Sequence, residues 1–284
     1  MAGGIDLHMH TTASDGRYRP QEIVAKAAAL GLSAIAICDH DTVGGLAEAL
    51  QAAEKFPQLK VIPGIEVSTH APGDEVHMLG YFINYKDPEF IQTLDGLRNS
   101  RLERAKSMVK KLNELGVDIE WQRVQELAGD ASVGRPHIAQ AMLEKGYITG
   151  FKQAFDKYIG LGGPAYVERH KITPAEAAGL ILKASGLPVL AHPLTIKEPE
   201  AMIAALKKAG LVGMEVYYNN FTPAQRQYLA GLAAKYALIA TGGSDYHGID
   251  DANETMIGAA GTPAVCLDNL TAIARQRGLN TYNL

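Results

Sequence analysis

The chain has 284 residues, of which 47% are hydrophobic and 20% are charged, and its formal net charge at pH 7 is -4. This composition is that of an ordinary water-soluble protein that is long enough to bury an extensive core. The small negative charge excludes an overall basic surface, so we expect no binding of long duplex nucleic acid through its phosphate backbone.

The two cysteines, Cys38 and Cys266, provide neither a disulfide framework nor a cysteine-rich zinc site, which favours a reducing environment. The first residues lack the basic and apolar regions of a signal peptide. No apolar run reaches the roughly 18 residues that a membrane span needs. We therefore expect a cytoplasmic protein without a membrane partner.

The chain begins with a predicted strand over residues 5–9, in which successive side chains point to opposite sides. Asp6, His8 and His10 then share one side, where two imidazoles and a carboxylate suit a divalent metal. The following pattern predicts strands over 34–38, 61–67 and 76–83 and helices over 20–30 and 45–55. This recurrence of strand, polar tip and helix is typical of parallel strands joined by helical crossovers.

The segment from about residue 88 to 164 contains no strand pattern. Its predicted helices cover residues 90–115, 119–127, 136–145 and 151–158. We interpret residues 89–164 as a helical insertion in a domain formed by residues 1–88 and 165–284. The basic side chains of the long helix are expected to form mostly a solvated face. They are Arg98, Arg101, Arg104, Lys106, Lys110 and Lys111.

The alternation of strands and helices resumes after this insertion. Helices are predicted over residues 174–184, 201–209, 223–236 and 269–277, and strands over 188–191, 214–217 and 238–241. The chain therefore has seven predicted strands in two blocks, one on each side of the helical segment.

Metal-binding residue types gather at or just after the C-terminal ends of these strands. They are His8, His10, His40, Glu66, His192, Asp245 and His247. In an α/β barrel this end of the strands carries the active site, because side chains from successive strands converge there. Glu66 is the strongest single candidate, since a carboxylate in an apolar strand must be paired or bound to a metal.

Several of these residues also have a simpler explanation. His40 lies in a segment that could cap the next helix, and Asp245 in one that could be an ordinary turn. Asp15, in Ser14-Asp15-Gly16, is still more typical of a turn. His77 begins its predicted strand instead of ending it. The remaining histidines, His70 and His170, are expected at the surface.

Taken in chain order, these motifs resemble those of the polymerase and histidinol phosphatase (PHP) family. The matching segments are Asp6-Leu7-His8-Met9-His10-Thr11, Ser14-Asp15-Gly16, Asp39-His40-Asp41, Pro63-Gly64-Ile65-Glu66, Ala191-His192-Pro193 and Ser244-Asp245-Tyr246-His247. The resemblance implies an α/β fold, a distorted seven-stranded (β/α) barrel of PHP type, here with a helical insertion.

The resemblance also implies three groups of metal ligands. They are His8, His10, Glu66 and Asp245 for the first, Glu66, His77 and His192 for the second, and Asp15, His40 and His247 for the third. We accordingly expect two or three divalent ions per chain. We expect manganese, with iron and zinc as alternatives, and the absence of a thiolate from the ligands fits all three metals.

Such a metal cluster suits hydrolysis of a phosphate ester, because the metals neutralise phosphoryl oxygens and supply an activated hydroxide as the nucleophile. The acid that protonates the leaving oxygen is expected to be Asp245 or His247.

A second anion site is predicted at Arg135 and His137, since Pro136 between them is typical of the first turn of a helix, whose N-terminus attracts anions. Arginine can also bind a phosphate through two hydrogen bonds. Arg17 and Lys171 are further candidates for contact with an anion.

Two anion sites indicate a small substrate with two phosphates. Within the family, the insertion and the Gly-Arg-Pro-His motif over residues 134–137 resemble the 3′,5′-nucleoside bisphosphate phosphatases. That resemblance implies removal of the 3′-phosphate to leave a nucleoside 5′-phosphate. The alternatives are a 5′-to-3′ exonuclease on short 5′-phosphorylated RNA, a histidinol-phosphatase-like activity, and a non-catalytic metal-binding module.

Overall fold

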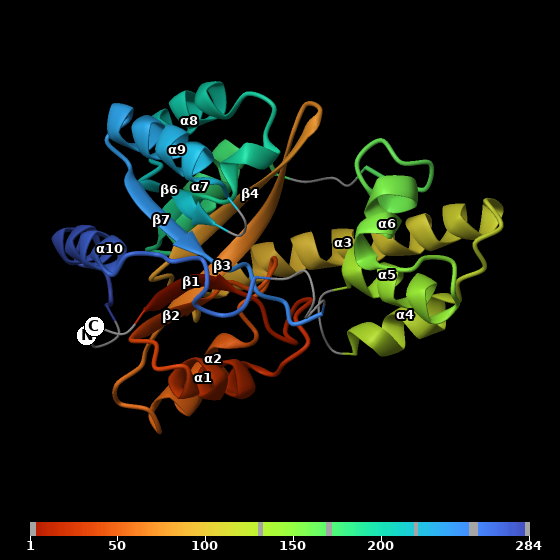
Figure 1. Cartoon of the computed structure of the whole chain (residues 1–284), viewed down its shortest axis with the longest axis horizontal. Coiled ribbons are helices and arrows are strands. Elements are labelled where there is room, and N and C mark those ends of the chain that lie inside the picture. Colours follow the sequence, from red (N-terminus) through yellow and green to blue (C-terminus); the bar gives the residue numbers. More distant parts are fainter. Residues whose placement is uncertain (1–3, 130–132, 169–171, 219–220, 250–254, 282–284) are drawn as a thin grey trace.

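The computed structural model of the chain describes residues 4–129, 133–168, 172–218, 221–249 and 255–281. Its strands form one sheet in which neighbours in space are neighbours in the chain (Figure 1). The strands are β1 (Ile5–Met9), β2 (Ala34–Ile37), β3 (Lys60–Ala71), β4 (Asp74–Tyr81), β5 (Leu187–Leu190), β6 (Gly213–Tyr218) and β7 (Ile239–Gly243). Each of the seven predicted strands is present, and the predicted seven-stranded α/β barrel is confirmed.

Strand β4 runs opposite to the other six. Strands β1, β2 and β3 pair in parallel, as do β5, β6 and β7, whereas β4 is antiparallel to both β3 and β5. The expectation of parallel strands with crossovers is therefore wrong for β4. Only Pro72 and Gly73 separate β3 from β4, whereas a parallel crossover needs a dozen or more residues. The reversal brings the beginning of β4, with His77, to the edge where β3 ends.

The first and last strands lie side by side and nearly close the barrel. The backbone N–H of Asp245 donates to the His8 carbonyl at 2.8 Å, and that of His10 to the Tyr246 carbonyl at 2.9 Å. Gly243 permits this approach, because a Cβ atom there would lie 2.4 Å from the His8 backbone nitrogen. The closure thus places the polar residues after β7 next to the histidines of β1.

In the described part of the chain, helices from both blocks of the α/β pattern surround the barrel (Figure 1). They are α1 (Pro20–Ala29), α2 (Leu46–Ala53), α7 (Pro174–Lys183), α8 (Pro199–Lys208), α9 (Pro223–Lys235) and α10 (Val265–Gln276). Thr173 and Thr222 cap α7 and α9 by accepting a backbone N–H in the first turn. The apolar faces of α1, α2 and α7 to α9 pack with strand residues into one core. Helix α10 packs against a second cluster with Ile5 and Ala34, which begin β1 and β2.

The remaining helices form a block beside the barrel (Figure 1). They are α3 (Pro88–Glu114), α4 (Trp121–Ala128), α5 (Arg135–Glu144), α6 (Phe151–Ala154) and the π-helical turn η1 (Phe155–Ile159). Helix α3 joins the two parts, because Phe90 and Leu94 pack into the barrel core whereas Met108 and Leu112 belong to the separate core of the block. We propose residues 89–164 as an insertion domain on a barrel formed by residues 1–88 and 165–284.

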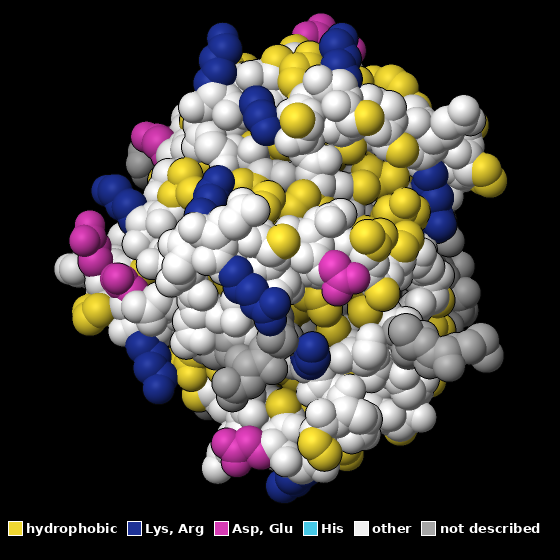
Figure 2. Space-filling view, turned by 90° about the vertical axis from the view of Figure 1, so that its left-hand side faces the viewer, with side chains coloured by type: hydrophobic (Ala, Val, Ile, Leu, Met, Phe, Trp, Pro, Cys, Tyr) yellow, Lys and Arg dark blue, Asp and Glu magenta, His cyan; other side chains and the backbone are white. Residues whose placement is uncertain are grey.

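The surface on the side of α10 has no continuous basic stripe. In Figure 2, Lys and Arg side chains stand apart from one another, and the described part of this face shows no histidine side chain. Among the described residues, none of the helices has the length and apolar character required to cross a membrane.

Candidate metal centre

The structure brings together the nine side chains that the sequence proposes as metal ligands, at the edge where the parallel strands end. They are His8, His10, Asp15, His40, Glu66, His77, His192, Asp245 and His247. The backbone at this edge is unusual, because His192 and Asp245 have positive φ angles of 27° and 54°. Residues other than glycine seldom adopt such angles, and those that do gather at functional sites.

One oxygen of Glu66 faces two histidines from different strands. Its Oε1 lies 2.8 Å from Nδ1 of His77 on β4 and 3.0 Å from Nε2 of His192, which follows β5 and precedes the 3₁₀ turn η2 (Pro193–Thr195). His77 reaches this place because β4 is antiparallel, so a residue near the start of β4 lies beside the end of β3. The weak position of His77 in the sequence pattern is explained by this reversal.

The other oxygen of Glu66 faces three more histidines. Its Oε2 lies 3.3 Å from His8 Nε2 and 3.2 Å from both His10 Nε2 and His40 Nδ1. Asp245 approaches from the opposite side, with Oδ1 3.2 Å from His8 Nε2 and 3.0 Å from His10 Nε2. The buried Glu66 carboxylate could therefore bridge two ions, one held on each of its sides.

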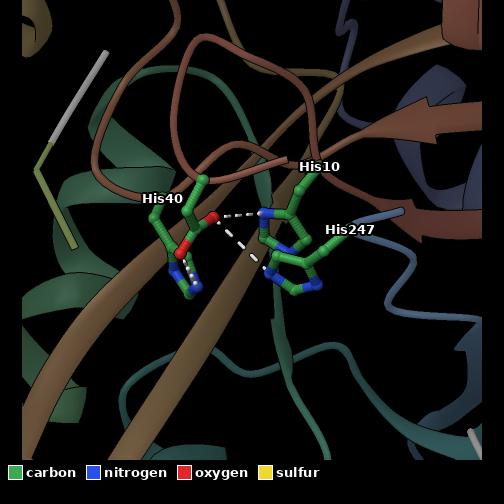
Figure 3. A group of neighbouring side chains, drawn as sticks. His10, His40 and His247 are labelled. Atoms are coloured by element: carbon green, nitrogen blue, oxygen red, sulfur yellow. Dashed lines mark ion pairs between the residues drawn. The ribbon is translucent and has the colours of Figure 1, made fainter. Parts of the chain in front are cut away.

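Asp15 is the centre of a neighbouring group, in which Figure 3 shows His10, His40 and His247 directed toward one carboxylate. Its Oδ1 lies 3.8 Å from His10 Nδ1 and 3.5 Å from His247 Nε2, and its Oδ2 lies 3.8 Å from His40 Nε2. The rings of His10 and His247 stack with centroids 4.1 Å apart. Asp15 thus contacts this cluster although its sequence is typical of a turn.

Four buried atoms in these groups have no hydrogen-bond partner in the part of the chain that the structure describes: His10 Nδ1, Asp15 Oδ1, His40 Nδ1 and Glu66 Oε2. Such atoms are costly unless something else satisfies them. Ligand atoms lie within 4.8 Å of one another in three sets: His10, Asp15, His40 and His247; His8, His10, Glu66 and Asp245; and His40, Glu66 and His77. Imidazole and carboxylate ligands fit divalent ions, so these sets could hold two or three.

The electrostatics of the site agree with metal binding. Burial alone would raise the pKa values of Glu66 and Asp245, yet neighbouring imidazoles hold both carboxyl groups well below their usual range. Burial lowers the pKa of His10, but Asp245 and Glu66 outweigh burial and raise it to about 10. A positive charge is therefore favoured between these carboxylates, and a metal ion supplies one.

Glu215 on β6 supports two of these histidines and is absent from the sequence prediction. It is fully buried, its Oε1 lies 3.0 Å from His8 Nδ1, and its Oε2 accepts the backbone N–H of His192 at 2.7 Å. The contact turns Nε2 of His8 toward Glu66, as carboxylates behind metal-bound histidines do. The signal in the sequence is the one used for Glu66, a carboxylate within an apolar strand.

Asp6 has a structural role instead of joining the cluster. It was expected to face the same point as the two histidines of β1, but its carboxylate accepts the backbone N–H groups of Ser244 at 2.9 Å and Gly258 at 2.7 Å. This buried carboxylate therefore fixes the segment after β7 against β1.

Asp39 holds the loop after β1 in a similar way. Its carboxylate accepts hydrogen bonds at 2.7 Å from the Thr11 N–H, the Thr11 hydroxyl and the Ser14 hydroxyl. The loop that carries Asp15 is thereby fixed to the end of β2.

A pocket of about 270 Å³, hereafter the main pocket, lies between the cluster and the helical block. Its barrel side includes Asp15, His40, His77 and His247, and its helical side includes Arg101, Arg104, Met108, Arg135, Ile138 and Phe155. The pocket therefore joins a possible metal site to a wall of arginine and apolar side chains.

The expectation that the basic face of α3 is solvated is wrong for Arg101 and Arg104, whose side chains are only 12% and 10% exposed. Arg101 donates to Asp41 Oδ2 at 2.6 Å, and Arg104 donates to the Val167 carbonyl at 2.9 Å. The two arginines lie three residues apart, so both project from one face of the helix, toward the barrel. Lys106, Lys110 and Lys111 on the same helix are exposed.

Arg104 and Arg135 share one carboxylate. Arg135 Nη1 lies 2.7 Å from Glu75 Oε2, and Arg104 Nη2 lies 3.3 Å from Glu75 Oε1. The Arg135 guanidinium also lies 5.3 Å from the centre of the Phe155 ring. Burial and the neighbouring Arg135 lower the pKa of Arg104 to about 10. This excess of buried positive charge favours a bound anion.

The other predicted anion contacts lie elsewhere. Arg17 and His137 line an adjoining pocket of about 450 Å³, which shares Asp15, Pro136, Phe151 and Ile249 with the main pocket. His137 Nδ1 accepts the backbone N–H of Gly134 at 2.9 Å. Arg135 and His137, expected to form one anion site, thus line different pockets. Lys171 and His170 lie outside the described residues.

Comparison with known proteins agrees with this geometry. The family model of the PHP domain matches residues 6–168, which is more than half of the chain and includes β1 to β4. The chain belongs to the PHP domain family. The matched part of this PHP chain carries His8, Asp15, His40, Glu66 and His77.

Relatives of the PHP chain act on phosphate esters. It is 35% identical over 246 residues to a 5′-3′ exoribonuclease of Haemophilus influenzae, covering 85% of this chain and 89% of that protein. It is 30% identical over 272 residues to a 3′,5′-nucleoside bisphosphate phosphatase of Chromobacterium violaceum, covering 92% and 93%.

A solved structure has the same fold over its whole length. This protein of Bifidobacterium adolescentis, proposed to be a metal-dependent phosphoesterase, matches with a TM-score of 0.88 at 30% identity, covering 100% of this chain and 99% of that one. The PHP chain is accordingly a hydrolase of the metal-dependent phosphoesterase type.

Proposed function

We propose that the enzyme is a phosphomonoester hydrolase that removes the 3′-phosphate of nucleoside 3′,5′-bisphosphates and leaves a nucleoside 5′-phosphate. The observation that carries this proposal is the main pocket, which has the possible metal ligands on one side and Arg104 and Arg135 on the other. A small substrate with two phosphates suits both sides at once. The Chromobacterium violaceum relative, named for this activity, supports the same substrate.

The residues of the pocket have distinct proposed roles. When bound, divalent ions supply positive charge to the phosphoryl oxygens and activate water. Asp245 and His247 are the candidates for holding the proton that the leaving 3′ oxygen requires. His247 fits this role better, because it lines the main pocket, whereas neighbouring imidazoles outweigh burial and hold the pKa of the Asp245 carboxyl well below its usual range. Arg135 holds the 5′-phosphate, and the ring of Phe155 beneath it supports the nucleoside and excludes water.

A second candidate is 5′-to-3′ exonuclease activity on short 5′-phosphorylated RNA. The adjoining pocket favours it, since this space continues past Asp15 and carries the exposed Arg17, which suits the backbone of a following nucleotide. The exoribonuclease of Haemophilus influenzae is a relative with such an activity in its name.

We propose manganese as the metal, two or three ions per chain, with iron and zinc as alternatives. The donor set of imidazoles and carboxylates without thiolate fits all three metals. We also propose a cytoplasmic location, in keeping with the two free cysteines, Cys38 and Cys266.

Activity on a panel of substrates tests the function. With manganese-loaded protein we expect kcat/KM to be higher for a nucleoside 3′,5′-bisphosphate than for short 5′-phosphorylated RNA or histidinol phosphate, with nucleoside 5′-phosphate and inorganic phosphate as products. Chelation should abolish the reaction and manganese should restore it. Stepwise release of 5′-mononucleotides from RNA at a higher kcat/KM would show that the exonuclease is the main activity.

Arg135→Ala tests how the second phosphate is held. Because hydrogen bonds to charged groups contribute about 1.5–3 kcal/mol, KM for the bisphosphate should rise roughly 10- to 100-fold. KM for a simple phosphomonoester should change little, since it has no second phosphate. Arg123→Ala is the matched control in the helical block, because Arg123 pairs with Glu144 and Glu126 on the surface. Equal effects of Arg135→Ala on both substrates would contradict the proposed role.

A further inference from the structure

The two oxygens of the Asp245 carboxylate have different partners. Oδ1 faces His8 and His10 at 3.2 and 3.0 Å. Oδ2 accepts a hydrogen bond from the hydroxyl of Tyr218 at 2.6 Å. The Asp245 carboxylate is thus held from both sides, by His10 at Oδ1 and by Tyr218 at Oδ2.

The backbone of Asp245 is fixed separately from its side chain. Its N–H donates to the His8 carbonyl at 2.8 Å, and its carbonyl lies 2.8 Å from His247 Nδ1. These contacts hold the main chain in place at its positive φ angle of 54°. The orientation of the carboxylate about its own side-chain bonds therefore needs a further contact, which Tyr218 supplies.

A break in the pairing of β6 and β7 aims Tyr218 at this position. The register shifts between Glu215 and Tyr217, so that Tyr217 and Tyr218 pair with Gly242 and Gly243. In a regular strand, Tyr217 would share the side of Glu215, but an irregularity of this kind re-aims the side chains that follow it. Both Glu215 and Tyr218 consequently contact the cluster.

The ring of Tyr218 is packed on the side of the cluster. Its centroid lies 5.4 Å from the His192 ring and 5.0 Å from the Phe221 ring. These contacts restrict the ring and hold the hydroxyl at a defined position. The hydrogen bond to Asp245 therefore costs little further conformational entropy of the Tyr218 side chain.

We propose that Tyr218 is a positioning residue that holds Oδ2 of Asp245 and thereby presents Oδ1, together with His8 and His10, to a divalent metal ion. The proposal rests on the metal-binding role of Asp245 in the proposed function. Tyr218 does not line the main pocket, so its effect is exerted through Asp245 and not by contact with the substrate.

Tyr218→Phe tests this proposal, with Tyr217→Phe as the matched control. Tyr217 is the adjacent, partly buried tyrosine and has no side-chain hydrogen bond in the described part of the chain. The dissociation constant for Mn²⁺ is measured by titration of the metal-free protein. Loss of a partner behind a metal ligand weakens metal binding 10- to 100-fold in typical cases, which we expect for Tyr218→Phe. Tyr217→Phe should bind Mn²⁺ within about twofold of the unchanged protein.

Two further measurements are the steady-state kinetics of Tyr218→Phe and the energetic coupling between Tyr218 and Asp245 in Mn²⁺ binding. At saturating Mn²⁺, Tyr218→Phe should lower kcat about 10-fold or more with little change in KM, because no substrate contact is lost. In a background with Asp245→Ala, Tyr218→Phe should leave the remaining Mn²⁺ affinity unchanged, since the residue through which it acts is absent.

Wild-type Mn²⁺ affinity in a folded Tyr218→Phe variant would overturn the proposal, as would additive effects of the two substitutions. Circular dichroism identifies a variant that has merely lost its fold, and Tyr218→Leu, whose side chain likewise has no hydrogen-bond donor, then repeats the titration. The Mn²⁺ measurement needs no substrate. Weaker binding in Tyr218→Phe thus supports the positioning role even if the bisphosphate is not hydrolysed.

Discussion

Glu66→Gln is expected to lower kcat/KM for the preferred phosphate ester by roughly a thousandfold or more, and to reduce the metal content of the protein. The Glu66 carboxylate faces His77 and His192 with one oxygen and His8, His10 and His40 with the other. The amide is the same size but carries no charge, so it cannot balance two ions. A thousandfold loss corresponds to about 4 kcal/mol, the scale of charge stabilisation by bound metals.

The measurement combines steady-state kinetics with metal analysis of the purified protein. Glu54→Gln is the control, since Glu54 is an exposed carboxylate just after α2, outside the cluster. It should retain full activity and metal content. If Glu66→Gln instead kept both near those of the unchanged protein in metal-defined buffer, Glu66 would not be the centre of the metal site.

The strand-end residues could be predicted because their pattern is local. His8 lies near the end of β1 and Asp245 just after β7, and the ends of parallel strands meet at one edge. Glu66, predicted to end a strand over residues 61–67, lies within β3, which continues to Ala71. The same rule could not place His77, since it assumes parallel strands. The eight residues between the strands predicted over 61–67 and 76–83 are already too few for a parallel crossover, so the antiparallel pairing could have been inferred from the spacing.

Other parts of the site depend on tertiary contacts that no local pattern contains. A charged helix face looks the same in sequence whether it meets solvent or a second domain, which is why Arg101 and Arg104 were assigned to a solvated face. Tyr218 depends on a register shift in β6, and strict alternation would have selected Tyr217. Glu215, in contrast, could have been predicted from the sequence. Like Glu66, it is a carboxylate within an apolar strand, and such a buried carboxylate must be paired or bound to a metal.

Arg101→Met is expected to destabilise the protein by about 3–5 kcal/mol, the second large effect that the structure predicts. The Arg101 guanidinium lies 2.6 Å from Asp41 Oδ2 and also donates to the Ser68 hydroxyl. Asp41 is fully buried, and its other oxygen accepts the Ser68 backbone N–H at 2.8 Å. Methionine removes the charge that compensates this carboxylate while keeping most of the side-chain volume. Urea unfolding followed by circular dichroism measures the loss.

The pair is also one of the contacts that attach α3 to the barrel, near the ends of β2 and β3, so its loss should move the helical wall of the main pocket. We therefore expect Arg101→Met to raise KM for the bisphosphate as well as to lower stability. Lys106→Met, which removes an exposed charge of the same helix, should change stability by less than about 1 kcal/mol. Adding Asp41→Asn to Arg101→Met should recover part of the stability, because the uncompensated buried charge is then absent. A loss of similar size in the single and double variants would indicate that packing, and not the buried charge, determines how the block is attached.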